Sequence, residues 1–420
     1  MLYIPLDRTA KRTYTKQIYY AIRQKILSGD LASDEALPPY RELSRELGVS
    51  KNTVLADGVI NFDNGQPALE LFPRARWNKA VSAAMLDIPA AALGYDIPQG
   101  RPELRQTLCE YLRKRQGLSC KADQIVVTSG AKQAITLAAE CLLTGQKEIW
   151  IEDPAPALLR RLLACHTERI RSFPVDEHGL NPARFPADGR PVLIIASPAR
   201  QFPTGAIMPM KRRVALVEFA ERTGAYLLED NFESEFNYDA PPASSLYELA
   251  PERVISVGTF SKVLYPSVRM GYMIAPTELL PLLCERKRLS DHHTNPVYQL
   301  ALSAFLADGT LEKHIRRMKR EYRARRDHLI ACLHQQFGDA VCVSGTASGM
   351  NLVAAFCDVC FTDETVQELL RYGVYAVPVE RQGQRTNELI LRYAGLTKDE
   401  LTLGAERLRV GIEGIRLCHL

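Results

Sequence analysis

The segment that most constrains this chain is a lysine enclosed by two apolar runs, VISVGTFSKVLYPSVRMGYMIA at residues 254–275. Lys262 lies between stretches that read as buried strands, and burying an unpaired ammonium group is costly. Such a lysine usually has a lowered pKa or a covalent partner, and a Schiff base with a carbonyl cofactor would provide both. Thr259, Ser261 and Arg269 are spaced to hold an anion beside it, as a cofactor phosphate requires. A lone lysine that snorkels at a sheet edge is the alternative interpretation.

Helix and strand signals alternate from residue 57 onward, which indicates a layered α/β fold. Residues 123–143, DQIVVTSGAKQAITLAAECLL, predict a strand, a turn at Gly130 and Ala131, and then a helix. Free backbone amides at the start of that helix would form a seat for a phosphate group. This pattern is common in α/β proteins, so it gains weight only beside the lysine segment.

Two further strands are predicted to lead into loops with polar residues. Residues 192–205, VLIIASPARQFPTG, read as a buried strand followed by a loop rich in proline and glycine. Residues 225–236, AYLLEDNFESEF, read as a strand with Asp230 at its carboxyl end. Because ligands bind at the carboxyl ends of strands in doubly wound sheets, Asp230 is well placed for a site. Capping of the next turn is the alternative role for this aspartate.

The first 56 residues carry most of the net charge of +4, since nine lysine and arginine residues there stand against six aspartate and glutamate residues. Residues 14–28 predict a helix with one apolar face. LPPYRELSRELGVSKNTVL, residues 37–55, predicts a second helix, a turn at Gly48 and a third helix capped by Ser50. Helix, turn and helix form a DNA-binding arrangement, and an ordinary helical hairpin is the alternative.

These segments together resemble a known family. The stretch around Gly48 resembles the GntR-type winged helix-turn-helix, and residues 254–275 resemble the pyridoxal-phosphate (PLP) lysine motif of fold-type I aminotransferases. A long basic helix predicted over residues 311–333 fits the same pattern. The chain is therefore identified as a member of the MocR subfamily of GntR-type transcription regulators, in which a DNA-binding head joins an aminotransferase-like body.

The resemblance implies an α/β fold of the fold-type I PLP-dependent transferase kind, with an N-terminal winged helix-turn-helix. The head should occupy residues 1–56, and the PLP-binding and dimerisation body residues 57–420. Within the body, a mostly parallel seven-stranded sheet is expected over about 90–300 and a small C-terminal part over about 301–420. The wing and linker expected after Ala56 are missing from the sequence, because the body begins at once with Asp57.

By resemblance, Lys262 forms the aldimine with PLP, and Asp230 pairs with the pyridine nitrogen and keeps it protonated. The phosphate would be held by groups from two turns, namely Thr259, Ser261, Arg269 and the amides of Gly130 and Ala131. Tyr95 matches a tyrosine that reaches the phosphate of the neighbouring subunit, which implies a homodimer. The DNA-contacting positions would be Arg41, Ser50, Lys51, Asn52 and Thr53.

The expected cofactor pocket departs from that of transaminases. The asparagine and tyrosine that usually hold the 3′-oxygen of PLP are replaced by Phe202 and Phe232, with Gln201 beside the first. Arg381 is the favoured candidate for binding the carboxylate of an effector, and Arg392 is the other candidate. No residue is assigned a catalytic role.

The DNA-binding head and the altered 3′-oxygen contacts favour a regulator over an enzyme. We expect a PLP-dependent transcription regulator that binds promoter DNA as a homodimer. Its signal would be PLP itself, as in control of vitamin B6 synthesis, or a small amino compound. A PLP-dependent aminotransferase is the alternative, and residual transaminase chemistry is compatible with the site.

Cysteine usage and hydropathy indicate where the protein acts. Ten cysteines are scattered through predicted helices and strands, as in a reduced, cytoplasmic protein. The isolated C-x-x-C of Cys357 and Cys360 is expected to pack in the structure rather than bind zinc, and no metal site is predicted. No signal peptide is recognised, and no apolar run approaches the roughly twenty residues of a membrane span.

Overall fold

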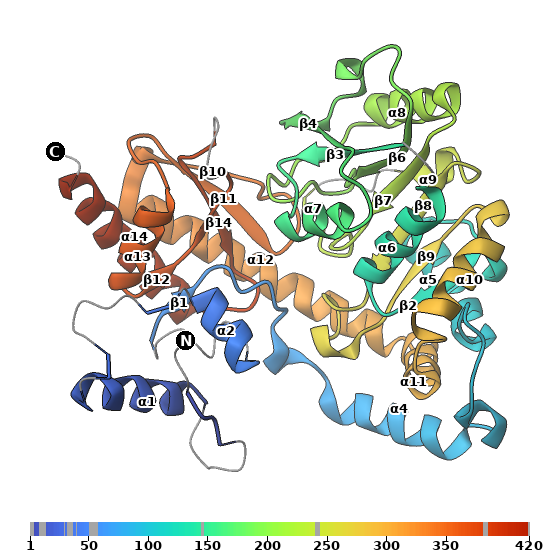
Figure 1. Cartoon of the computed structure of the whole chain (residues 1–420), viewed down its shortest axis with the longest axis horizontal. Coiled ribbons are helices and arrows are strands. Elements are labelled where there is room, and N and C mark those ends of the chain that lie inside the picture. Colours follow the sequence, from blue (N-terminus) through green and yellow to red (C-terminus); the bar gives the residue numbers. More distant parts are fainter. Residues whose placement is uncertain are drawn as a thin grey trace.

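The computed structural model describes residues 4–7, 14–28, 30–31, 37–38, 40–49, 58–143, 147–239, 244–380 and 385–418. Two sheets of unequal size organise residues 58–418 into a large and a small part (Figure 1). A long helix, α12 (Thr310–Phe337), runs beneath the large part and continues into the small part.

The large part is built on an eight-stranded sheet with the order β2-β9-β8-β7-β6-β3-β4-β5. Its strands are β2 (Ile125–Thr128), β3 (Glu148–Asp153), β4 (Ile170–Asp176), β5 (Gly179–Leu180), β6 (Pro191–Ala196), β7 (Tyr226–Asp230), β8 (Val254–Thr259) and β9 (Gly271–Ile274). The run from β4 through β3, β6 and β7 to β8 pairs in parallel, whereas β9 is antiparallel to both neighbours. The prediction of a mostly parallel seven-stranded sheet is confirmed for the first seven strands of this order, and the two-residue β5 adds a short antiparallel edge.

Helices cover both faces of this sheet, which explains why its strands are apolar almost throughout. Side chains alternate between the faces along each strand. Ile149 and Ile151 of β3 belong to the core beneath α6 (Ala131–Leu142), α7 (Ala157–Ala164) and α10 (Leu280–Asp291). Trp150, between them, packs on the opposite face against Phe219 of α8 (Met210–Thr223).

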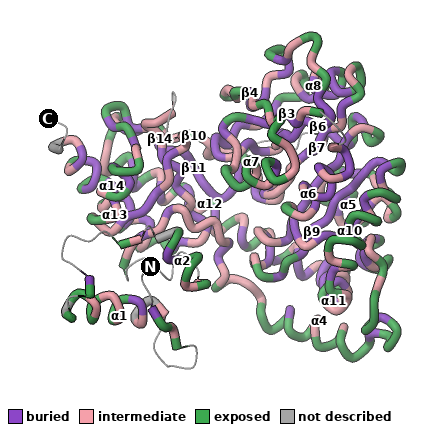
Figure 2. Tube along the Cα trace, in the orientation of Figure 1, coloured by how far each residue is buried: buried purple, intermediate pink, exposed green. Residues whose placement is uncertain are grey.

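The opposite face is also covered by helices from both ends of the body, and the buried residues run continuously along it (Figure 2). These helices are α4 (Arg74–Asp87), α5 (Pro102–Gln116), α9 (Leu246–Leu249), α11 (Pro296–Ala307) and α12. Leu104, Leu108 and Leu112 of α5 are fully buried at helical spacing, as their pattern in the sequence requires.

The small part contains a four-stranded antiparallel sheet with the order β10-β11-β14-β13. Its strands are β10 (Val341–Ser344), β11 (Asn351–Phe356), β13 (Val377–Pro378) and β14 (Glu388–Arg392). The helices α13 (Asp363–Arg371) and α14 (Lys398–Cys418) pack beside it together with the second half of α12. A parallel pair, β1 (Ile60–Asn61) and β12 (Val374–Tyr375), attaches the beginning of the body to this part.

The head is described over two helices, α1 (Tyr14–Ser28) and α2 (Tyr40–Leu47). Ile18 of α1 and Leu43 of α2 are buried against each other and Ile4. α2 ends in a turn at Gly48, whose φ of 61° suits glycine, and the Ser44 hydroxyl donates to the Val49 carbonyl at 2.7 Å. The predicted third helix and the Ala56–Asp57 join lie outside the described residues.

The Cys357 and Cys360 thiols are both exposed, so the prediction that they pack in the structure is wrong. In the connection between β11 and α13, Val359 and Phe361 are the residues that pack into the core, and the two cysteines beside them face solvent. Across the part of the chain that the structure describes, no three His, Cys, Asp or Glu side chains are grouped to hold a metal ion. Within that same part, no helix is both long and apolar enough to cross a membrane.

Candidate cofactor-binding site

The predicted site residues gather at the edge of the large sheet where its parallel strands end. Asp230 is the last residue of β7, and Thr259 is the last residue of the adjacent strand β8. Lys262 follows in the turn after β8, and Gly130 begins α6 directly after β2. The carboxyl edge of a doubly wound sheet is the expected place for a ligand, and these elements bring the residues there.

Lys262 reaches a backbone carbonyl far away in the sequence. Its Nζ donates to the Gly65 carbonyl at 2.6 Å. Burial lowers the pKa of Lys262 below its usual value; the Glu233 carboxylate opposes this shift, and the Arg392 and Arg200 guanidinium groups add to it. A lysine with a lowered pKa is more often a neutral amine, which is the form that attacks a carbonyl carbon.

The side chains of Arg392 and Lys262 both lie close to Gly65. A Cβ there would lie 2.4 Å from Arg392 Nη1 and 3.6 Å from Lys262 Nζ. The missing side chain therefore lets an arginine of the small part approach the lysine of the large part.

Asp230 has an unpartnered acceptor. Its Oδ1 is buried and has no hydrogen-bond partner among the described residues. Burial, together with the nearby Glu233 carboxylate, raises the pKa of Asp230 to about 7. A buried acceptor without a donor is costly, and a protonated ring nitrogen would supply the missing donor. The carboxyl group thus fits the pyridine nitrogen of PLP.

The groups predicted to hold the phosphate lie close together. A Cβ at Gly130 would lie 3.9 Å from Arg269 Nη1 and 4.0 Å from Thr259 Oγ1. The Gly130 cap of α6 has no side-chain hydrogen bond, and Arg269 has no ion pair with any described residue. The Thr259 hydroxyl donates to Ser261 Oγ at 3.2 Å. An unpaired cation, a hydroxyl and an open helix N-terminus together suit an anion such as phosphate.

A buried lysine that the sequence analysis missed supports the Ser129 turn from behind. Lys287 of α10 is 0% exposed, and its Nζ donates to Asp291 Oδ1 at 2.8 Å and to Gln133 Oε1 at 3.2 Å. Gln133 Oε1 also accepts from the Ser129 amide at 2.8 Å, and the Ser129 hydroxyl donates to Asp291 Oδ2 at 3.2 Å. These bonds hold the turn that begins α6. In the sequence Lys287 lies in the charged run ERKR, which reads as a solvated face, so no signal separated it from its neighbours.

The side of the site expected to face the 3′-oxygen of PLP is aromatic. Phe202 and Phe232 meet edge to face with ring centroids 6.1 Å apart. The Gln201 side chain is 1% exposed and already bonded, since its Nε2 donates to the Pro154 and Phe202 carbonyls and its Oε1 accepts from Thr204. Gln201 was predicted to bind the cofactor, but a direct contact would require it to exchange one of these bonds.

Of the two arginines proposed for a carboxylate, the structure describes one. Arg392 ends β14, and its guanidinium lies 5.0 Å from the Phe202 ring centroid and near Asp63, with Nε 3.7 Å from Oδ1. Its Nε is buried without a hydrogen-bond partner among the described residues, so Arg392 is placed to bind an anion beside Lys262. Arg381 lies outside the described residues.

The remaining predicted residues lie away from this site. Tyr95 is 86% exposed, and its ring centroid lies 5.0 Å from that of His292. Such exposure leaves Tyr95 available to a second subunit. Arg41 belongs to α2, and the other predicted DNA contacts lie outside the described residues: Ser50, Lys51, Asn52 and Thr53.

Comparison with known proteins divides the chain at the join between head and body. Residues 57–408 match the family described as aminotransferase class I and II, and residues 14–56 match the bacterial regulatory proteins of the gntR family. The chain is 27% identical to the probable rhizopine catabolism regulatory protein MocR of Rhizobium meliloti, over 96% of this chain and 94% of that protein. It is 31% identical to the pyridoxine biosynthesis transcriptional regulator PdxR of Corynebacterium glutamicum, over 74% of this chain and 76% of that regulator.

A solved enzyme structure has the same fold. The α-aminoadipate aminotransferase LysN of Thermus thermophilus, complexed with N-(5′-phosphopyridoxyl)-L-leucine, superposes with a TM-score of 0.79 at 25% identity. The similarity covers 92% of this chain and 100% of the enzyme chain. The predictions of fold and of the relatives of this chain are thereby confirmed.

Proposed function

Because this chain belongs to the aminotransferase class I and II family and carries the gntR-type head of MocR-type regulators, we propose that it is a PLP-binding regulator of transcription. The aminotransferase-like body would serve as the sensor and the head as the DNA-binding element. The proposal includes a homodimer, with Tyr95 of each subunit reaching the phosphate site of the other. Arg41 and positions 50–53 would contact DNA.

Different residues of the site would bind different parts of PLP. The Lys262 amine would attach the cofactor covalently, and the Asp230 carboxylate would hold the proton on the ring nitrogen. Arg269, the Thr259 and Ser261 hydroxyls and the amides at Gly130 and Ala131 would bind the phosphate. When bound, PLP supplies an aldehyde for amines and a ring that withdraws electrons.

Two observations together support a regulator over an enzyme. The chain carries a gntR-type head, and the side of the site expected to face the 3′-oxygen of PLP is lined by aromatic rings. Phe202 and Phe232 offer no hydrogen bond to that oxygen, so the ring would be held at the nitrogen and the phosphate only. Looser control of the ring suits binding more than turnover. Arg392 beside Lys262 favours the second candidate, an aminotransferase that acts on an amino acid.

The proposed signal is PLP itself, with a small amino compound as the competing signal. The relative PdxR is named for pyridoxine biosynthesis, and MocR for rhizopine catabolism. The first name supports control of vitamin B6 synthesis, and Arg392 as a carboxylate-binding group supports the competing signal.

The test is a footprint on the promoter region beside the gene, with and without PLP, for the wild type and Lys262→Ala. The expected result is protection that changes with PLP in the wild type but not in Lys262→Ala. Lys398→Ala, an exposed lysine of α14, is the matched control and should behave as the wild type. Absence of protection by any of the three proteins, together with steady transamination of amino acids by the wild type, would favour the enzyme.

A further inference from the structure

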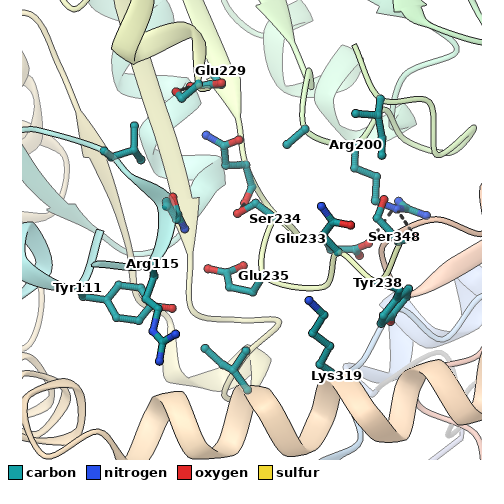
Figure 3. A pocket seen from close by; sticks show the side chains of 18 of the residues that line it. Tyr111, Arg115, Arg200, Glu229, Glu233, Ser234, Glu235, Tyr238, Lys319 and Ser348 are labelled. Carbon is teal, nitrogen blue, oxygen red and sulfur yellow. Dashed lines mark hydrogen bonds and ion pairs between the residues drawn. The ribbon is translucent and has the colours of Figure 1, made fainter. Parts of the chain in front are cut away.

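A second cavity lies apart from Lys262 and Asp230. It has a volume of about 380 Å³ and is bounded by the segment after β7, the end of α5 and the first turns of α12 (Figure 3). Neither Lys262 nor Asp230 lines it. A volume of this size is within the range of small-molecule sites, which is roughly 300–1,000 Å³.

Several charged groups of the cavity wall are already bonded within the protein. The Arg213 guanidinium donates to three backbone carbonyls, those of Met208, Ser244 and Pro198. The Glu229 carboxylate accepts from the Leu246 amide at 2.9 Å and also from the Ser245 hydroxyl. These groups are structural and are not available to a ligand.

Two groups of opposite charge make no ion pair with any described residue, although Ser234 and the Glu235 amide hydrogen-bond to the Glu235 carboxylate. Glu235 Oε2 is buried without a hydrogen-bond partner, and Lys319 has no hydrogen bond or ion pair with any described residue. Figure 3 shows Lys319 rising from α12 toward the segment that carries Glu233 and Glu235. Burial raises the pKa of Glu235 to about 7, as expected for a carboxyl group that lacks a cation.

Two neutral or cationic donors in the same wall are also unsatisfied. Ser348 is 3% exposed, and its Oγ has no hydrogen-bond partner among the described residues. Arg200 is 2% exposed, and its Nη1 makes an ion pair with Glu233 at 3.3 Å but no hydrogen bond. Unsatisfied buried polar atoms are uncommon in folded proteins, and three in one cavity, Glu235 Oε2, Ser348 Oγ and Arg200 Nη1, indicate a missing polar ligand.

We propose that this cavity binds a small zwitterion, a compound of amino-acid size with one ammonium group and one carboxylate. The ammonium group would pair with Glu235, and the carboxylate would pair with Lys319 and accept from the Ser348 hydroxyl. A simple anion would leave Glu235 without a partner, and a simple cation would leave Lys319 without one. Only a ligand with both charges pairs with both the buried Glu235 carboxyl group and the partly exposed Lys319 ammonium group.

The cavity is connected to the small part of the molecule by hydrogen bonds. Arg200 Nε donates to the Ser348 carbonyl at 2.9 Å, and the Met350 amide donates to Glu233 Oε2 at 3.1 Å. The wall segment that carries Glu233 and Glu235 begins directly after Asp230. A ligand in the cavity would therefore contact both the small part and the continuation of the strand that ends at Asp230.

The test uses calorimetric titration of the full-length chain with L-leucine and L-glutamine. Two probes that each lack one charge of leucine, 4-methylpentanoate and 3-methylbutylamine, serve as ligand controls. The expected result is saturable binding of at least one amino acid and roughly tenfold weaker binding or none for its singly charged analogues. Titration of Lys262→Ala should give the same affinity, which separates this cavity from the proposed cofactor site.

Glu235→Gln and Lys319→Met should each weaken the binding by roughly tenfold or more. Lys313→Met, an exposed lysine on the same helix outside the cavity wall, should leave it unchanged. Lys319 is on the helix surface, so its substitution tests the idea even if Glu235→Gln disturbs folding. Unchanged affinity in Lys319→Met, loss of binding in Lys262→Ala, or no saturable binding of either amino acid would overturn the proposal.

Discussion

At the scale of single residues, the site is defined by two groups whose ionisation the fold disfavours. Lys262 is an amine with a lowered pKa beside other cations, and Asp230 is a carboxyl group with a raised pKa and an unpartnered oxygen. Both states are costly for an empty site. Both costs fall when a carbonyl compound with a basic ring nitrogen binds at the carboxyl ends of strands β7 and β8.

Lys262→Ala should abolish the covalent attachment of PLP. The wild-type protein with PLP should absorb in the visible range and retain the cofactor after borohydride reduction. The variant should show neither property, because no other lysine lies in a matching motif. Absorption spectra and intact mass before and after reduction provide the measurement, with Lys398→Ala as the control. A reducible cofactor at full occupancy in Lys262→Ala would show that another lysine is the attachment point.

Asp230→Asn should flatten the pH dependence of stability in the cofactor-free protein. The pKa of Asp230 is raised from 3.8 to about 7, so the folded state binds more protons than the unfolded state between these values. Its contribution to the free energy of unfolding is therefore present at low pH and lost as the pH rises through about 7. Burial also raises the pKa values of Glu152 and Glu235 to about 7, so these two groups likewise make the protein less stable as the pH rises.

Asp230→Asn removes the contribution of one of these three carboxyl groups. Between roughly pH 5 and pH 8, the free energy of unfolding of the variant should therefore fall less than that of the wild type. Chemical denaturation at several pH values measures the slope. Asp188→Asn, at an exposed carboxylate, is the control and should follow the wild type. An Asp230→Asn curve parallel to the wild type would mean that this carboxyl group is ionised in the folded state throughout the range.

At the scale of elements, two helices position the groups proposed to bind the phosphate. α6 supplies its open N-terminus, and α10 supplies Lys287, which fixes the Ser129 turn through Gln133 and Asp291. The strand, turn and helix around Gly130 were predictable, because an apolar run, a glycine and a helical pattern succeed one another. The Lys287 support was not, because its partners are distant in sequence and its own surroundings are charged.

Lys287→Met should weaken PLP binding and lower stability together. Loss of the ammonium group frees Asp291 and Gln133, so the turn before α6 loses its support. We expect the affinity for PLP to fall by roughly tenfold, about 1.4 kcal/mol, and the free energy of unfolding to fall by about 1–3 kcal/mol, since Asp291 remains partly solvated. Equilibrium titration with PLP and urea denaturation measure the two effects.

Lys398→Met is the matched control for this variant. Lys287→Arg, which keeps the charge, should restore part of the PLP affinity. A loss of stability in Lys287→Met with unchanged PLP affinity would restrict this lysine to a structural role in α10.

At the scale of the whole molecule, one body carries one head, and in the proposed dimer the exposed Tyr95 of each body would lie near the cofactor site of the other. The fold class, the strand at Asp230 and the lysine turn could be read from local patterns. The nearness of Arg392 to Lys262 could not, because it depends on how the small part closes on the large part. Placement of Glu235 and Lys319 around one cavity likewise depends on α12 passing beneath the large sheet.

DNA binding should depend on the spacing of two half-sites. Phosphate contacts from a single head give affinity that is salt-dependent and largely blind to sequence. Two heads in a dimer should prefer half-sites separated by whole turns of roughly 10 bp. Inserting about half a turn between half-sites should weaken binding strongly, and a full turn should cost less. Mobility shifts at fixed salt measure both.

The isolated head is the control for this prediction, and it should bind without preference for either spacing. Equal affinity of the intact protein for both insertions would exclude a dimer with fixed heads. Full specific affinity from the head alone would exclude it as well.

The hydrogen bond from Lys262 to the Gly65 carbonyl has a consequence for the path between the two ends of this molecule. Gly65 lies seven residues after Gly58, where the described body begins, so the connecting chain spans at most about 25 Å. Lys262 Nζ, which would attach a cofactor, thus also holds the segment of chain that leads back from Gly65 toward the head. Occupation of that nitrogen would release Gly65, whereas the pairing of β1 with β12 would still hold residues 60–61, so the freed segment would be the short stretch between β1 and Gly65.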